Sequence, residues 1–465
     1  MQDKEQQSMG NEVSGMSPVE RRASISLAAI MATRMLGLFM ILPVFALYAE
    51  SLPDSSPLLI GLAIGIYGLT QALLQIPFGM ASDKFGRRRM ITIGLLLFAA
   101  GSVAAASADS LMGIIFGRAL QGAGAVAAVI MALTADLTRE EQRTKAMAVI
   151  GMSIGGAFTL ALVIGPLLND VIGVSGIFWF TAILAVLAIV ILWTQVPQPT
   201  QSHMHHDAQL DPGLTWSVLK DSQLLRLDAG IFILHTILTS TFIVVPFVLR
   251  DSLGIDVGHH SWVYLPVLLL SAGAMVPFII VAEKKRKMKQ IFVSAVTILG
   301  LSLLTMSQWY ENAIAFFVLL WLFFTAFNFL EASLPSLVSK TAHAARKGTA
   351  MGVYSSSQFL GAFVGGSAGG LLYGEFGISG VFISSALLIV VWWLLAITMR
   401  PPLYLANIVM PAHGLNEAQA SELAAKLEAV AGVVEVVVII EENEAYLKVD
   451  NQLLDRDTLQ KLLPS

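Results

Sequence analysis

The sequence contains no cysteine and little charge. None of its 465 residues is cysteine, and only 13% are charged. Without thiols the chain has no disulfide framework, zinc–thiolate site or cysteine nucleophile. Soluble proteins carry about 25% charged residues, so about half of the expected charge is missing. This deficit excludes a disordered chain and a large soluble enzyme, and the net charge of −4 gives no basic footprint for nucleic acid.

Long apolar stretches take the place of the missing charge. Hydrophobic residues make up 56% of the chain, and the mean hydropathy is +0.74. A hydrocarbon core about 30 Å thick needs about 20 apolar residues per helix. Twelve such stretches predict an all-α polytopic membrane protein with twelve transmembrane helices. They lie near residues 24–49, 57–81, 90–107, 110–133, 145–169, 174–195, 224–249, 260–282, 290–307, 312–338, 349–372 and 377–399.

Lysine and arginine are concentrated in alternate loops. The N-terminus and the loops after the even-numbered stretches carry 19 of them, whereas the six opposite loops carry only Arg250. Because positively charged loops stay in the cytoplasm, both chain ends are expected there. The polar first 20 residues do not resemble a cleaved signal peptide. We therefore expect a multi-pass protein of the bacterial inner membrane.

The chain divides into two halves that resemble each other. Ile76-Pro77-Phe78 recurs as Val276-Pro277-Phe278, and several further short matches follow at nearly the same offset. A polar segment rich in proline and glutamine separates the halves. Duplication of a six-helix unit, with a cavity between the two bundles, explains this pattern. The expected organisation is a cytoplasmic segment at 1–23, six-helix bundles at 24–196 and 223–400, a linker at 197–222 and a separate domain at 403–465.

The most specific motif connects the second and third stretches. Residues 79–89 read Gly-Met-Ala-Ser-Asp-Lys-Phe-Gly-Arg-Arg-Arg. The glycines permit close helix approach and a tight turn, and the aspartate can meet a helix N-terminus. Charges that only set topology would explain the arginines but not the spacing of the other residues. The motif resembles the signature loop of the major facilitator superfamily. That resemblance implies a conformational gate on the cytoplasmic side, formed by Gly79, Asp83, Gly86, Arg87, Arg88 and Asp136.

A second motif lies in the fourth stretch, where Arg118 begins the run Arg-Ala-Leu-Gln-Gly-Ala-Gly. An arginine inside an apolar helix costs at least about 2.5–3.5 kcal/mol, so it should face a cavity or a partner. The run resembles the superfamily's fourth-helix motif, whose arginine is tied to proton coupling. The glycines and Pro166 of the fifth stretch resemble the drug:proton antiporter group. However, Asn169 and Asp170 stand where that group has a glycine pair, which leaves uptake and facilitated passage open beside export.

Titratable groups are scarce inside the membrane. The first six stretches have no acid at mid-depth, whereas Glu331 lies in the tenth stretch and His235 in the seventh. Glu331 is either a proton or substrate site or an ion pair with Arg34 or Arg118. His235 either titrates or forms a hydrogen bond between helices. The residues expected to couple protons or substrate are Arg34, Arg118, His235 and Glu331. The cavity candidates are Tyr67, Gln71, Gln75, Gln121 and Asn328.

Residues 403–465 differ in kind from the rest. They carry ten acidic and four basic residues, a net charge of −6, whereas the preceding part of the chain is close to +2. Their predicted strand, helix, strand, strand and helix, with the last helix from about Asp455, resemble a ferredoxin-like fold lacking its final strand. The absence of cysteine argues against a soft-metal role. Because the charges are opposite, we expect this domain to dock on the basic cytoplasmic loops.

These features predict a secondary active transporter that exports small amphipathic compounds by alternating access, coupled to protons. A uniporter or symporter of the same fold is one alternative, and a non-transporting sensor that signals through the C-terminal domain is another. No arrangement of nucleophile and base, or of metal ligands, suggests an enzyme, a metal site or a cofactor. The expected partners are a small-molecule substrate, protons and the lipid bilayer, but no nucleic acid. A monomer is expected.

Overall fold

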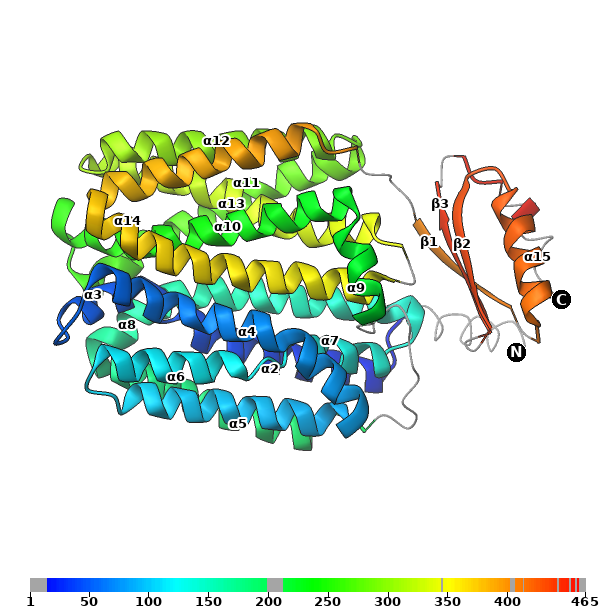
Figure 1. Cartoon of the computed structure of the whole chain (residues 1–465), viewed down its shortest axis with the longest axis horizontal. Helices are drawn as coiled ribbons and strands as arrows, with labels where there is room; N and C mark the ends of the chain where they lie inside the picture. Colours follow the sequence, from blue (N-terminus) through cyan, green and yellow to red (C-terminus); the bar gives the residue numbers. More distant parts are fainter. Residues whose placement is uncertain are drawn as a thin grey trace, which may run out of the picture.

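The structure is a computed structural model that describes residues 15–198, 212–343, 346–401, 406–412, 414–440, 443–450, 453–455 and 458–459. Residues 1–14 of the expected N-terminal segment and residues 199–211, half of the expected linker, therefore lie outside the described residues. Two groups of long helices lie side by side, and a small sheet lies beyond one end of them (Figure 1).

The first group of helices contains the first half of the sequence, and the second group contains the second half (Figure 1). The first group consists of α2 (Pro18–Phe39), α3 (Leu42–Glu50), α4 (Pro57–Phe85), α5 (Arg87–Ala106), α6 (Leu111–Ala123), α7 (Ala127–Asp136) and α8 (Glu140–Thr194). The second consists of α9 (Pro212–Leu219), α10 (Ser222–Phe247), α11 (His260–Lys284), α12 (Met288–Trp309), α13 (Ala313–Thr341) and α14 (Lys347–Ile397).

Ten apolar helical spans in the described part of the chain are long enough to cross a membrane. Two of them, Lys145–Thr194 and Lys347–Ile397, have 50 and 51 residues. At 1.5 Å per residue each would be about 75 Å long, more than twice the thickness of the hydrocarbon core. Gly173 interrupts the first with a φ of 68°, and Gly377 interrupts the second with a φ of 65°. Each long span is therefore two crossings joined by a glycine turn, and the twelve predicted crossings are confirmed.

Two crossings are broken inside the bundle. The first divides into α2 and α3, and Pro43 occupies the first turn of α3. The fourth divides into α6 and α7 around Gly124. A Cβ atom on Gly124 would lie 2.2 Å from the carbonyl oxygen of Gly94, so only glycine lets these two backbones approach.

The two halves touch most closely along α4 and α14. A Cβ atom on Gly61 would lie 2.1 Å from the carbonyl oxygen of Gly366, and one on Gly370 would lie 2.2 Å from that of Pro57. These contacts lie near the start of α4, which follows an extracytoplasmic loop. The ion pair between Arg250 Nη2 and Glu50 Oε2, at 2.9 Å, joins the halves at the same end. The extracytoplasmic end of the bundle is therefore closed.

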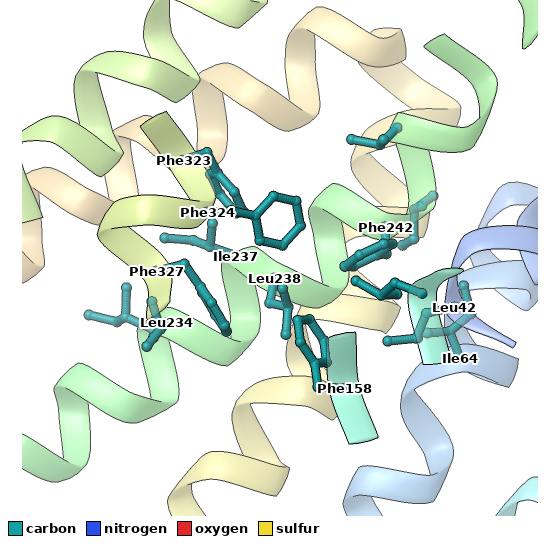
Figure 2. Packing of buried hydrophobic residues seen from close by; sticks show 14 of the residues in the cluster. Leu42, Ile64, Phe158, Leu234, Ile237, Leu238, Phe242, Phe323, Phe324 and Phe327 are labelled. Atoms are coloured by element: carbon teal, nitrogen blue, oxygen red, sulfur yellow. The ribbon is translucent and has the colours of Figure 1, made fainter. Parts of the chain in front are cut away.

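Aromatic residues continue this contact toward the middle of the bundle. The rings of Phe158 on α8 and Phe327 on α13 stack with centroids 6.1 Å apart, and Phe39 on α2 meets Phe158 edge-on at 5.0 Å. Figure 2 shows Phe158 beside Leu238 of α10, with Phe327 nearby. Residues from both halves thus form one hydrophobic cluster beneath the closed end.

The C-terminal domain contains β1 (Ala406–Pro411), α15 (Glu417–Glu428), β2 (Val433–Ile439) and β3 (Glu444–Val449). The sheet order is β1-β3-β2, with β3 antiparallel to both neighbours. This is the split βαβ arrangement of a ferredoxin-like fold. Asn416 caps α15 in a capping box with Gln419. The predicted final helix lies mostly outside the described residues.

Polar contacts between described residues join the C-terminal domain to loops of the second half. Arg286 Nη2 lies 3.1 Å from Asp450 Oδ1, and His343 Nδ1 lies 2.7 Å from Glu435 Oε1. Lys448 Nζ donates to the carbonyl oxygen of Ala342 at 2.6 Å. Burial raises the pKa of Glu435, but its hydrogen bonds with His343 and Lys448 outweigh burial and hold the pKa below its ordinary value.

Candidate functional site

A cavity of about 2350 Å³ lies between the two halves. Tyr67 and Phe327 line it near the middle of the bundle, and Lys347 lines it at the start of α14. Its lining also includes Met410 and Lys448 of the C-terminal domain. The cavity therefore opens toward the cytoplasmic end, where the domain borders its mouth, while the opposite end is closed. This is an inward-open arrangement.

The first half contributes a buried polar network to the cavity wall. Arg34 on α2 is only 1% exposed, and its Nη2 donates to the Tyr67 hydroxyl and to Gln71 Oε1, each at 2.5 Å. Gln71 Nε2 in turn donates to Gln75 Oε1 at 2.6 Å. Tyr67 and Gln75 line the cavity, whereas Arg34 and Gln71 lie behind them. One turn of α4 between each pair aligns Tyr67, Gln71 and Gln75 on one face.

Arg118 lies beside this network on α6 and also lines the cavity. It donates to Gln121 Oε1 at 2.9 Å and to the carbonyl oxygens of Ala63 and Ile64 on α4. Gln121 is completely buried, and its Nε2 donates a hydrogen bond to the hydroxyl oxygen of Ser102. The Arg118 guanidinium also lies 5.1 Å from the centroid of the Tyr67 ring. Among the candidates, Gln121 thus supports Arg118 rather than facing the cavity.

The second half contributes the titratable groups. Glu331 Oε2 on α13 lies 3.1 Å from His235 Nε2 on α10, and Gln358 Nε2 on α14 donates to Glu331 Oε1 at 2.9 Å. All three residues line the cavity. One alternative expected from the sequence was an ion pair between Glu331 and Arg34 or Arg118. The structure differs from it, because both arginines donate hydrogen bonds to oxygen atoms of the first half. Asn328 also lines the cavity and donates to Ser271 at 3.0 Å.

The signature loop forms a separate cluster near the cavity mouth. Arg87 at the start of α5 pairs with Asp83 of α4 and, at 3.2 Å, with Asp136 of α7. Gly86 joins α4 to α5 with a φ of 94°, a conformation that favours glycine. Gly79 and Asp83 line the cavity.

Arg88 lies apart from this cluster. It donates to the carbonyl oxygen of Leu192 at 2.8 Å and stacks on Trp193 of α8 at 4.7 Å from the ring centroid. Of the expected gate residues, the structure therefore brings Asp83, Arg87 and Asp136 together, while Arg88 holds α5 to the end of α8.

Three residues of this region were not identified from the sequence. Gln358 bridges Glu331 and His235, and Tyr354 lines the cavity one turn before it. Asp228 on α10 is 5% exposed, and neither carboxylate oxygen has a hydrogen-bond partner within the described residues. A polar side chain in an otherwise apolar stretch was the signal available for Gln358 and Asp228.

Comparisons with known proteins agree with this architecture. A model of the Major Facilitator Superfamily matches residues 27–366, and a model of the YajR YAM domain matches residues 407–465. The inner membrane transport protein YajR of Escherichia coli is 46% identical over 96% of this chain and 98% of its own length. An uncharacterized transporter of Buchnera aphidicola is 35% identical over 75% of this chain and 90% of its own.

A solved structure shares the fold. It is a bacterial homologue of the human lysosomal transporter Spinster in an inward-facing, occupied conformation. The two structures superimpose with a TM-score of 0.69 over 83% of this chain and 98% of the other, at 13% sequence identity.

Proposed function

The chain belongs to the major facilitator superfamily, and from this premise we propose that it exports small amphipathic compounds in exchange for protons. It is a multi-pass secondary transporter of the inner membrane and not an enzyme. The proposal adds a direction of transport, a class of substrate and a coupling ion. The observation that carries it is the cluster of Glu331, His235 and Gln358 on the cavity wall.

The hydrogen bonds of this cluster depend on where a proton lies. His235 Nε2 lies 3.1 Å from Glu331 Oε2 and 2.7 Å from Gln358 Nε2. A protonated Nε2 donates to the carboxylate, whereas an unprotonated Nε2 accepts from the amide. In the second case a proton on Glu331 relieves the repulsion between the carboxylate and the imidazole lone pair. The cluster thus offers two positions for a proton, His235 Nε2 and Glu331, and moving the proton between them changes the hydrogen-bond partner of the Gln358 amide.

The cluster of Asp83, Arg87 and Asp136 supports a gate at the cavity mouth. All three residues belong to the first half, and the Asp83 side chain is 35% exposed. Lys347 and Gly348, at the N-terminus of α14, line the same cavity. When the cytoplasmic end closes, Asp83 is in a position to meet this helix N-terminus, whose partial positive charge attracts a carboxylate. The gate would then stabilise the outward-facing state.

Reconstituted transport tests the proposal. The full chain is placed in liposomes containing a pH-sensitive dye, and lipophilic ions of both charges and sugars are offered. We expect proton movement whenever a compound is translocated, and loss of that coupling in Glu331→Gln. The matched control is Glu375→Gln, an exposed carboxyl beside the extracytoplasmic turn at Gly377. Translocation without proton movement would reject the exchange and favour the uniporter; protons moving with the compound would favour the symporter.

Two variants separate the remaining roles. Asp83→Asn should slow conformational cycling more than it lowers expression, and unaltered transport in this variant would remove Asp83 from the gate. Deletion of residues 403–465 should change the transport rate without abolishing flux. A chain that signals through this domain but translocates nothing would instead be the non-transporting sensor.

A further inference from the structure

The hydrogen bonds of the first-half wall all run in one direction. A guanidinium only donates, so the Tyr67 oxygen and Gln71 Oε1 are acceptors for Arg34. Gln71 then donates through its amide nitrogen to Gln75 Oε1. The hydroxyl hydrogen of Tyr67 and the amide hydrogens of Gln75 can therefore be donated to a molecule in the cavity. The network behind the wall therefore orients donors, rather than acceptors, toward the cavity.

The same wall carries positive charge, and in the described part of the chain neither Arg34 nor Arg118 forms an ion pair with a carboxylate. Every hydrogen bond of Arg118 described above ends on a neutral oxygen. Arg34 Nε and Nη1 are buried and have no partner in the part of the chain that the structure describes. A guanidinium in a low-dielectric interior is costly unless an anion offsets it. Two such groups behind one surface make that surface attractive to negative charge.

A helix terminus adds to this field. The break at Gly124 places the start of α7 inside the bundle, and Ala127 and Ala128 of its first turn line the cavity. Among the described residues, no side chain forms a capping hydrogen bond at this terminus. Free backbone N–H groups at a helix N-terminus favour an anion. Three independent features of one wall thus have the same electrostatic sign.

We propose that this wall binds an anionic group of the transported compound, a carboxylate or a comparable organic anion carried on an apolar body. Tyr67 and Gln75 donate to the anion, Arg34 supplies positive charge behind them, and Arg118 supplies it beside them at the cavity wall. Phe158 and Phe327 offer an apolar surface to the rest of the molecule. This assignment deepens the proposed transport function and rests on the cavity being the transport pathway, but not on proton coupling.

An anionic substrate also bears on the direction of transport. The membrane potential of a bacterium is negative inside, so it drives anions out of the cell. An inward-open cavity lined by donors would load the anion from the cytoplasm, and the potential would favour its release outside. Export of such a compound therefore gains a driving force from the potential whether or not a proton moves in exchange.

The test is equilibrium binding to the full chain in nanodiscs, with no pH gradient or membrane potential. The probes are a naphthalene carboxylate, the matching amide and the matching ammonium, and the same three head groups on an octyl chain. Because hydrogen bonds to a charged group are the stronger ones, we expect the carboxylate to bind at least about tenfold more tightly than the amide. The ammonium should bind most weakly.

Four variants assign this preference to the wall. Tyr67→Phe and Arg34→Met should bring the Kd of the carboxylate close to that of the amide, whereas Arg34→Lys, which keeps the charge, should retain the preference. Tyr264→Phe is the matched control, because it removes another completely buried phenol hydroxyl, on α11 of the second half. Tyr67→Phe alone remains informative if Arg34→Met does not fold.

Equal binding of carboxylate and amide, a preference for the ammonium, or no carboxylate binding on either body would overturn the proposal. Loss of the preference in Tyr264→Phe would also overturn its assignment to this wall. Since binding is measured without gradients, it is separable from the liposome assay. A carboxylate that binds and is then transported without proton movement would contradict proton-coupled export but not the anion site.

Discussion

Arg250 donates to Glu50 at 2.9 Å and thereby joins the two halves of the transporter at its closed, extracytoplasmic end. Arg250 follows α10 in the second half, and Glu50 ends α3 in the first. Arg250 is also the one lysine or arginine in the extracytoplasmic loops that the sequence predicts. An ion pair across two halves that rock apart exists only while that end is closed. We therefore expect the pair to stabilise the inward-open state.

Removing this ion pair should shift the equilibrium between the inward-open and outward-open states. Arg250→Gln is expected to populate the outward-open state more, by up to about fivefold, because a partly exposed ion pair contributes about 0.2–1 kcal/mol. Spin labels on Leu58→Cys and Phe376→Cys report the separation of the halves, and the absence of native cysteine makes both labels specific. Asp251→Asn is the control, since Asp251 pairs with Arg250 within one loop. Identical distance distributions for Arg250→Gln and the parent chain would show that the pair does not hold the halves together.

The glycine contact between α4 and α14 should be indispensable for the same closure. In Gly366→Val, the new Cβ would lie 2.5 Å from the carbonyl oxygen of Gly61, and a backbone atom cannot move aside as a side chain can. Overpacking costs about 1–3 kcal/mol, so we expect transport to fall about tenfold or more. Gly273→Ala on α11 meets nothing within 4 Å and should transport normally. Normal flux in Gly366→Val would mean that the halves need not touch here during the cycle.

Hydropathy and charge predict the architecture well because they depend on depth in the membrane. The twelve crossings and their orientation follow from the length of apolar runs and from the side on which lysine and arginine lie. The signature motif, by resemblance, also predicts the meeting of Arg87 with Asp136, 49 positions apart. These inferences need no knowledge of how each helix is rotated about its axis.

The site depends on that rotation, which the sequence does not reveal. The sequence leaves open whether Glu331 is a proton or substrate site or pairs with an arginine, and α13 places it against His235 and Gln358. Gln121 shares a motif with Arg118 yet points to Ser102, away from the cavity. Which polar residue faces the cavity and which supports another residue is decided by helix packing.

Asp228 provides a test of buried charge. Its carboxylate is 5% exposed and has no partner within the described residues. Since an unsatisfied buried polar group costs about 1–3 kcal/mol, Asp228→Leu, which has a similar shape, should raise the thermal unfolding midpoint. Asp221→Leu on the same helix should lower it, because Asp221 caps α10 and loss of a cap costs about 0.5–2 kcal/mol. Scanning calorimetry in one detergent compares the two, and a lower midpoint for Asp228→Leu would mean that the carboxylate contributes to stability.

The contact between His343 and Glu435 should make docking of the C-terminal domain depend on pH. The pKa of Glu435 is below its ordinary value of 4.5, because its hydrogen bonds outweigh the effect of burial. A lowered carboxyl pKa means that the docked state favours the ionised form. Its contribution is fully present above pH 4.5 and is lost as pH falls through the lowered pKa. Docking should therefore weaken as pH falls below about 4.5.

Spin labels at Lys284→Cys and Glu428→Cys, on the second half and on α15, measure the docked fraction between about pH 7 and pH 3. Because the His343 side chain is 56% exposed, the loss of docked fraction at low pH should not exceed about fivefold. Glu435→Gln should reduce this loss, since its amide can still form hydrogen bonds but carries no titratable charge. Arg286→Gln is the comparison at neutral pH, where removing its ion pair with Asp450 should lower the docked fraction. An unchanged loss in Glu435→Gln would assign the pH response to another group. A docked fraction that rises as pH falls below about 4.5 would contradict the sign derived from the lowered pKa of Glu435.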